Sequence, residues 1–117
     1  MGQAQESREG NVDLISLQGI LDEDAILDLR RAISTLRRRG SQKILLLGGG
    51  IERVEIKGLE LARGAIRLFR HLNGIVALAD CRERDRRVLE RSSWYKYLNV
   101  FKTRQEALAF LDPSKSG

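Results

Sequence analysis

The sequence has one cysteine, few aromatic residues and no long apolar run. The single cysteine, Cys81, excludes an internal disulfide and a metal site built from several thiolates, and a reducing compartment such as the cytoplasm is the simplest expectation. Aromatic residues make up 5% of the chain, so we expect a core of Leu, Ile, Val and Ala. The longest apolar runs, Ile44–Leu47 and Ile75–Ala79, fall far short of the roughly 20 residues of a membrane helix. The first residues lack the apolar stretch of a signal peptide, so we expect neither secretion nor membrane insertion.

The sequence also lacks a recognisable catalytic or metal-binding set. His71 is the only histidine, and its place near the end of an expected helix favours a solvated surface position over a base or a ligand. The arginines that follow Cys81 could lower the pKa of its thiol, but no second cysteine or histidine accompanies it. Asp22, Glu23 and Asp24 are expected to be favourable charges at a helix N-terminus rather than metal ligands. We therefore expect no enzyme, no metal and no cofactor.

Charged residues, in contrast, make up 32% of the chain, with a net charge of +5. Such an excess is typical of proteins that meet nucleic acid or an acidic surface. The arginines fall on three expected helices with acidic residues among several of them, and no aromatic residues alternate with them as in proteins that bind single strands. We expect solvated helix faces or an acidic protein partner, with nucleic acid as the weaker alternative.

The apolar pattern predicts an α/β domain. Two strands, Gln3–Arg8 and Val12–Gln18, flank a turn at Glu9-Gly10-Asn11, and unbroken apolar segments further on are typical of strands covered on both faces. The later expected elements are a helix between Asp22 and Gly40, the strand Lys43–Leu47, a helix from Leu59 to Asn73-Gly74, the strand Ile75–Ala79, an arginine-rich helix capped by Asp80, the strand Tyr97–Phe101 and the helix Arg104–Leu111 opened by Thr103 and Glu106. This order predicts one domain over 1–117, ordered over about 5–111 with a loose tail at 112–117. Its mixed, mainly parallel sheet should have four to five strands, with Ile44–Leu47 central, and four helices.

Several motifs resemble those of STAS domains, the family of bacterial anti-sigma factor antagonists. Gly19-Ile20-Leu21-Asp22 is similar to the Gly-x-x-Asp that ends the second strand of the family, and Gly58-Leu59 is similar to its Gly-Leu pair after the switch serine. The family's C-terminal third is resembled by Val88-Leu89, Trp94–Phe101 and Thr103–Ala107. The resemblance covers about residues 5–111. It implies the STAS fold, a non-catalytic interaction or signalling module, and an anti-sigma factor kinase or related signalling protein as partner.

The resemblance breaks down at the residue that the family phosphorylates. Many members carry Asp-Ser-Ser/Thr/Ala-Gly-Leu in the switch loop and are phosphorylated on the first serine, whereas the matching residues here are Glu55, Ile56, Lys57, Gly58 and Leu59. Because no hydroxyl is present, we expect no phosphorylation there. The expected partner-binding surface consists of Asp22, Val54, Glu55, Ile56, Lys57 and Gly58. Val54 and Ile56 would be apolar anchors, while Glu55 and Lys57 would set charge specificity.

A second class of function stays open at Gly48–Gly50. Three glycines after a buried strand could form a flexible turn that opens the switch loop, or they could cradle a phosphate. The alternative is therefore a small-ligand or nucleotide-binding sensor that uses this loop. The run lacks both the Gly-x-Gly-x-x-Gly spacing and the Gly-Lys-Ser/Thr ending of established phosphate loops. The oligomeric state is unknown from the sequence.

Overall fold

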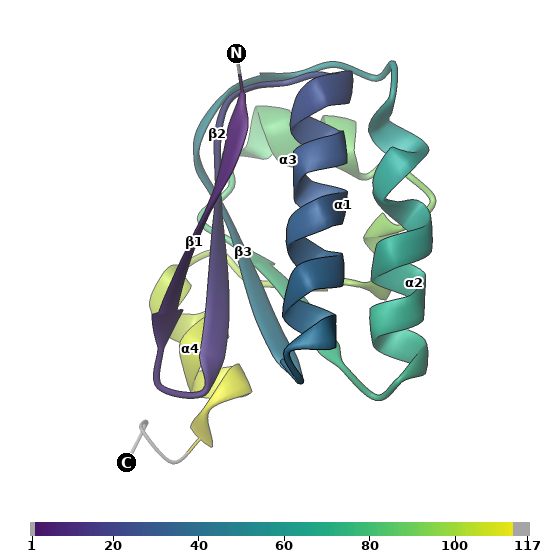
Figure 1. The fold of residues 1–117 in the computed structure, drawn as a ribbon. Helices are drawn as coiled ribbons and strands as arrows, with labels where there is room; N and C mark the ends of the chain where they lie inside the picture. Colours follow the sequence, from purple (N-terminus) through teal and green to yellow (C-terminus); the bar gives the residue numbers. More distant parts are fainter. Residues whose placement is uncertain (1, 114–117) are drawn as a thin grey trace.

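A five-stranded sheet organises the fold, in the strand order β1-β2-β3-β4-β5 (Figure 1). The computed structural model describes residues 2–113. The strands are β1 Gln3–Glu9, β2 Val12–Leu21, β3 Lys43–Val54, β4 Ile75–Ala79 and β5 Asn99–Val100. The first pair is antiparallel and the other three pairs are parallel. In this range the α-helices are α1 Glu23–Arg38, α2 Arg63–His71, α3 Glu83–Leu89 and α4 Arg104–Leu111, and the 3-10 turns are η1 Leu59–Ala62 and η2 Tyr95–Tyr97. The expected mixed α/β architecture is confirmed.

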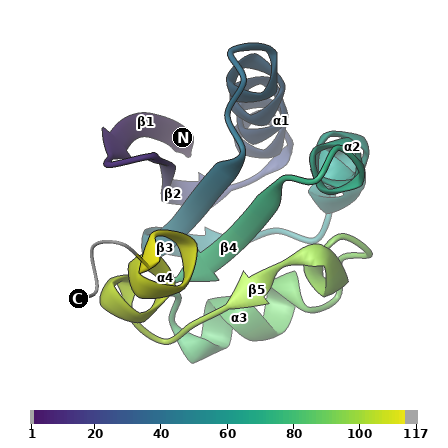
Figure 2. The same cartoon turned by 90° about the horizontal axis from the view of Figure 1, so that it is seen from below.

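Helices cover both faces of the sheet. Figure 2 shows α1 and α2 on one side and α4 on the other. Residues of β3 alternate between two apolar clusters: Ile44 and Leu46 join the side chains of α1 and α2, while Leu45 and Leu47 join those of α4. All four residues are buried, so the expectation of a central strand here is confirmed. The core is mainly aliphatic, as the composition predicts, with Phe69 and Trp94 as its large aromatic members.

The helix ends follow from local sequence. Asp22 caps α1, because its Oδ1 accepts a hydrogen bond from the backbone N–H of Ala25 at 3.0 Å. Gly40 follows the last turn of α1 with φ 90°, a conformation that favours glycine. Thr103 caps α4 by accepting a hydrogen bond from the backbone N–H of Glu106 at 3.1 Å. The Thr103 cap is the one that the sequence predicts, and the bounds of α4 are confirmed. Asp22 was expected only as a favourable charge at the start of α1.

The glycine run differs from its expectation. β3 continues through Gly48–Gly50 to Val54, so these residues are neither a flexible turn nor a loop that cradles a phosphate. A Cβ at Gly48 would lie 2.9 Å from Cβ of Cys81, and one at Gly49 would lie 2.7 Å from Oδ2 of Asp80. The missing side chains let β3 pass close to the segment that leads into α3. The ligand-binding alternative as drawn from the sequence was therefore wrong, because the loop that it requires is a strand.

Three further boundaries differ from expectation. Asp80 does not cap α3; it has φ 60°, and the N-cap is Arg82. The final strand is only Asn99–Val100, because the preceding residues form η2. The helix expected from Leu59 begins as η1 and continues as α2. Within the expected tail, Asp112 is buried, while 114–117 lie outside the described residues. Among the helices described, none has both the length and the apolar character needed to cross a bilayer.

Candidate functional site

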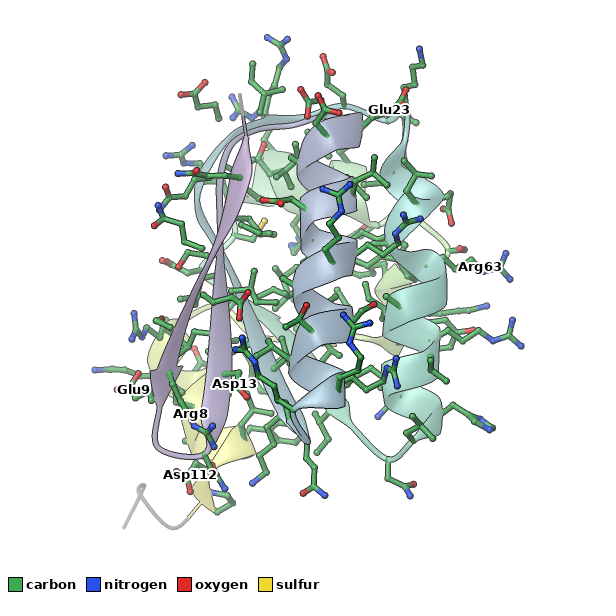
Figure 3. All side chains as sticks on the ribbon, in the orientation of Figure 1. Arg8, Glu9, Asp13, Glu23, Arg63 and Asp112 are labelled. Carbon is green, nitrogen blue, oxygen red and sulfur yellow. The ribbon has the colours of Figure 1, made fainter. Side chains whose placement is uncertain are left out.

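The loop Glu55–Gly58, here called the β3–η1 loop, lies where β2 and β3 both end. Val54 pairs with Leu21, and the backbone N–H of Glu55 donates to the carbonyl of Leu21 at 3.0 Å. The loop therefore leaves the sheet beside the residue that precedes Asp22, the cap of α1. Figure 3 shows Glu23 at this end of α1, next to the loop. The geometry of two parallel strands thus joins segments that are about thirty residues apart in the sequence.

A tight turn closes the β3–η1 loop. The backbone N–H of Leu59 donates to the carbonyl of Ile56 at 3.1 Å. Gly58 has φ 82° and ψ −5°, which are the values of the third position of a type II turn. A Cβ at Gly58 would also lie 3.0 Å from Cα of Glu23, and closer still to its Cγ. Glycine is therefore required here both by the backbone conformation and by the approach of α1.

Charged side chains surround the loop. Lys57 Nζ lies 3.5 Å from Glu23 Oε1, and a guanidinium nitrogen of Arg53 lies 3.2 Å from Glu55 Oε2. A depression of about 330 Å³ is lined by Asp22, Glu23, Asp24, Glu55 and Lys57, so four carboxylates face one ammonium group. Exposed pairs of this kind contribute at most about 1 kcal/mol to folding. Their charges therefore remain available to a partner.

Ile56 is the apolar side chain that projects from this surface. It is 56% exposed and lies at the tip of the loop, whereas Val54 is half-buried and packs against the core. The structure brings together all six residues expected at the site, Asp22 and Val54–Gly58. Two of them also make contacts within the fold. The half-buried side chain of Val54 packs against the core, and the Asp22 carboxylate caps α1.

The residues that hold η1 in place could not be predicted from the sequence. The indole Nε1 of Trp94 donates to the carbonyl of Leu59 at 2.8 Å. The backbone N–H of Ser93 donates to Glu60 Oε1 at 2.7 Å, and the Ser93 hydroxyl donates to the other oxygen of the same carboxylate. The hydroxyl contact is the main cause that lowers the pKa of Glu60. These contacts join residues more than thirty positions apart, and no local pattern encodes them.

The other candidate residues have structural roles. Burial raises the pKa of the Cys81 thiol to about 11, with Asp85 as a second cause, and these effects outweigh the lowering by Arg82 that the sequence suggested as a possibility. Ser92 donates its hydroxyl to the carbonyl of Leu89 at 2.7 Å, in the turn that follows α3. His71 is exposed, as expected. Among residues 2–113, no group of three His, Cys, Asp or Glu side chains is arranged to hold a metal ion.

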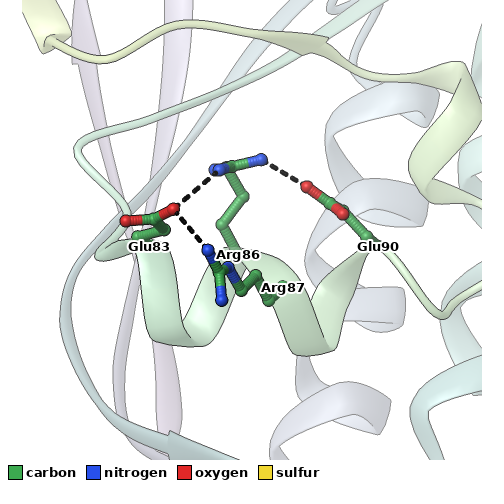
Figure 4. A network of polar contacts seen from close by, with 4 residues as sticks. All are labelled: Glu83, Arg86, Arg87 and Glu90. Carbon is green, nitrogen blue, oxygen red and sulfur yellow. Dashed lines mark hydrogen bonds and ion pairs between the residues drawn. The ribbon is translucent and has the colours of Figure 1, made fainter.

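The arginines of α3 are used within the fold. Figure 4 shows Arg86 between Glu83 and Glu90, and Arg87 against Glu83. Two arginines near the start of this helix instead reach β3. Arg82 donates to the carbonyl of Ile51 at 2.8 Å, and Arg84 donates to the carbonyl of Glu52 at 2.6 Å. These four arginines are thus paired or anchored by the chain itself.

Known proteins resemble this chain in structure rather than in sequence. No protein-family model matches the sequence, and no curated protein matches it. A Thermotoga maritima protein described as a candidate anti-sigma factor antagonist superposes with a TM-score of 0.78 at 16% identity, over 92% of this chain and 93% of that chain. The anti-sigma factor antagonist SpoIIAA in its unphosphorylated form gives 0.69 at 20% identity, over 97% and 99% of the two chains. An anti-sigma factor antagonist from Mycobacterium paratuberculosis gives 0.72 at 14% identity, over 95% and 94%.

At these identities the likeness establishes the fold alone. The element order is the one that the apolar pattern predicts, and the sheet is mixed and mainly parallel as expected. The chain therefore has the STAS fold of anti-sigma factor antagonists.

Proposed function

We propose that this chain is a non-catalytic protein-interaction module of a bacterial signalling pathway. Its contact surface would be the β3–η1 loop with Val54 and Asp22. The partner would be an anti-sigma factor kinase or a related signalling protein in the cytoplasm. The STAS fold supports this proposal, because the structural neighbours are described as anti-sigma factor antagonists.

The observation that carries the proposal is the exposure of Ile56. Complete burial of an aliphatic side chain of this size contributes about 1.5–3 kcal/mol, and this side chain is 56% exposed at the tip of a closed turn. Charged groups surround it, with acidic residues at the start of α1 and Lys57 beside it. An apolar centre with a charged rim is the arrangement found in many protein interfaces.

The same surface would work without the covalent switch of the family. No residue from Val54 to Leu59 has a hydroxyl group. A phosphate would add a charge of nearly −2 that can be removed, whereas Glu55 supplies one permanent negative charge. We therefore expect constitutive binding that a kinase does not regulate at this loop.

The test is calorimetric titration of the protein with the anti-sigma factor kinases of its source organism. We expect one of them to bind, and Ile56→Asp to weaken that binding by about thirtyfold, since a charge would enter a desolvated contact. Leu72→Asp is the matched control, because Leu72 is 54% exposed and lies at the far end of α2. It should bind normally.

Thermal melting of both variants separates binding from folding. An Ile56→Asp variant that folds normally and binds normally would place the interface elsewhere. Absence of binding by the unmodified protein to every such kinase would remove the proposed partner class. Incubation with the same kinases and ATP, followed by mass mapping, checks for phosphate. Stoichiometric phosphate on Ser93 that changes partner binding would contradict unregulated binding.

A further inference from the structure

A cationic depression lies at the end of α2 that is farthest from the β3–η1 loop. Its volume is about 520 Å³, and its lining includes Arg67, Arg70 and His71 of α2 together with Ile75 and Tyr97. No lining residue is acidic. Figure 1 places the C-terminal end of α2 at the opposite end of the molecule from the loop, so this surface is separate from the proposed interface.

The arginines of this depression are not neutralised by the chain. α2 contains no acidic residue, and among residues 2–113 neither Arg67 nor Arg70 has an ion-pair partner within 4.0 Å. On α3, in contrast, Arg86 and Arg87 are paired with acidic residues of their own helix (Figure 4). Two unpaired cations one helical turn apart on the same helix face repel each other. An anion that bridges them would remove this cost.

The helix dipole explains only part of this arrangement. It favours Arg70 and His71, which lie in the last turn of α2. It does not account for Arg67, which precedes that turn, or for the neighbouring wall formed by Ile75 and Tyr97. This wall comes from other parts of the chain, since η2 packs against α2. Lys96 Nζ lies 5.4 Å from the ring centroid of Tyr97 and adds positive charge there.

We propose that this depression binds the phosphate ester of a small organic molecule. The phosphate would lie on the Arg67 and Arg70 guanidinium groups, with His71 beside them, and the organic part would lie against Ile75 and Tyr97. Guanidinium groups match phosphate oxygens with paired hydrogen bonds, and several cations can share one phosphate. A phosphate ester presents more acceptor oxygens to two neighbouring guanidinium groups than a carboxylate does. The volume falls within the range of about 300–1,000 Å³ that is typical of small-molecule sites, so a bare ion would leave most of it unfilled.

Phenyl phosphate is a suitable probe because it joins a phosphate to one aromatic ring. Backbone amide NMR spectra of the full chain at low salt are recorded during titrations with phenyl phosphate, inorganic phosphate and phenol. We expect saturable shifts around Arg67–Ile75 and Tyr97 with phenyl phosphate, weaker binding of inorganic phosphate and none of phenol. Arg67→Gln and Arg70→Gln should each weaken the binding of phenyl phosphate by about tenfold, and raised salt should weaken it further.

Arg31→Gln is the matched control. Arg31 is exposed on α1 and does not line the depression. The Arg31→Gln substitution lowers the net charge of the protein by the same amount as the test variants. Because Arg31 does not line the depression, this variant should bind phenyl phosphate as the unmodified protein does. An equal loss in this control would mean that only the overall charge attracts the probe, and the site would be refuted. No saturable shift in the millimolar range, or equal binding of inorganic phosphate and phenyl phosphate, would also overturn the proposal. Unchanged amide spectra away from the substituted residue show that each variant is folded.

Discussion

At the scale of single residues, two glycines that are six positions apart have opposite effects on stability. Gly58 combines a left-handed backbone conformation with close contact to Glu23, so any side chain there strains the turn that presents Ile56. Gly64 lies in the first turn of α2, and a Cβ there would meet nothing within 4 Å. One glycine sets the geometry of the proposed interface, while the other only lowers helix stability.

Gly58→Ala should therefore destabilise the protein by about 1–3 kcal/mol, since strain in the left-handed region adds to the contact with α1. Gly64→Ala should stabilise it by about 0.5–1 kcal/mol, the difference between the helix propensities of the two residues. Denaturant unfolding of both variants measures these changes. Equal stability of the Gly58→Ala variant and the unmodified protein would show that the turn relaxes at little cost.

Cys81 should react slowly with alkylating reagents. Burial raises its pKa from 9.0 to about 11, so the thiolate fraction near pH 8 falls about a hundredfold below that of an unperturbed thiol. The rate of iodoacetamide labelling, compared between folded and denatured protein, measures this difference. The same shift makes stability depend on pH. The thiol ionises at a lower pH in the unfolded chain than in the folded one, so the free energy of unfolding declines as pH rises from about 9 towards 11. Rapid labelling of the folded protein near pH 8 would contradict the buried, neutral thiol.

At the scale of elements, η1 is held by the turn between α3 and η2. Ser93 donates two hydrogen bonds to Glu60, and Trp94 donates one to the carbonyl of Leu59. The element that follows the β3–η1 loop is therefore held by residues more than thirty positions further along the chain. Trp94 is 1% exposed and also packs in the core. The position of the loop thus depends on a segment that does not line the proposed interface.

Glu60→Gln should lower the stability near pH 7 by less than about 1 kcal/mol, because the carboxylate is exposed and screened by solvent. The pKa of Glu60 is lower in the folded protein than in the unfolded chain. The contribution of its carboxylate to stability is therefore present above the unfolded pKa near 4.5 and is lost as pH falls through the lower folded value. The variant and the unmodified protein should therefore converge in stability as the pH falls below the folded pKa of Glu60. Glu52→Gln is the control, since among the described residues the Glu52 side chain has no ion pair. A pH-independent difference would show that the Ser93 contact does not distinguish the charged form.

Elements with a strong local pattern could be predicted from the sequence, and elements defined by distant contacts could not. The bounds of α4 and its cap at Thr103 depend on neighbouring residues, and these predictions are confirmed. Gly48–Gly50 looked like a loop because glycine weakens strands, yet Cys81 and Asp80 pack where their side chains would be. The six expected site residues lie together because two parallel strands end side by side. The contacts of Ser93 and Trp94 with η1, and the gathering of Arg67, Arg70 and Tyr97 around one depression, depend on tertiary structure, which the sequence pattern does not encode.

At the scale of the whole molecule, the two proposed surfaces lie at opposite ends of α1 and α2. Acidic residues gather at the N-terminal end of α1, and unpaired arginines lie along α2 as far as its C-terminal end. The axes of α1 and α2 run between these ends (Figure 1), so the acidic residues at the start of α1 and Arg70 and His71 at the end of α2 lie where the helix dipoles favour them. The net charge of +5 is therefore unevenly distributed, and partners of opposite charge would approach different ends of the protein.

The sheet also restricts how any partner can bind. One outer strand, β1, carries Glu6, Arg8 and Glu9 among polar neighbours, and the other, β5, has only two residues. Charge and shortness are the two features that prevent a sheet edge from pairing with a further strand. A peptide could not gain a run of main-chain hydrogen bonds by extending this sheet, as ligands of many small domains do. We therefore expect recognition through loops and helix surfaces, and the same edges disfavour fibrillar self-association.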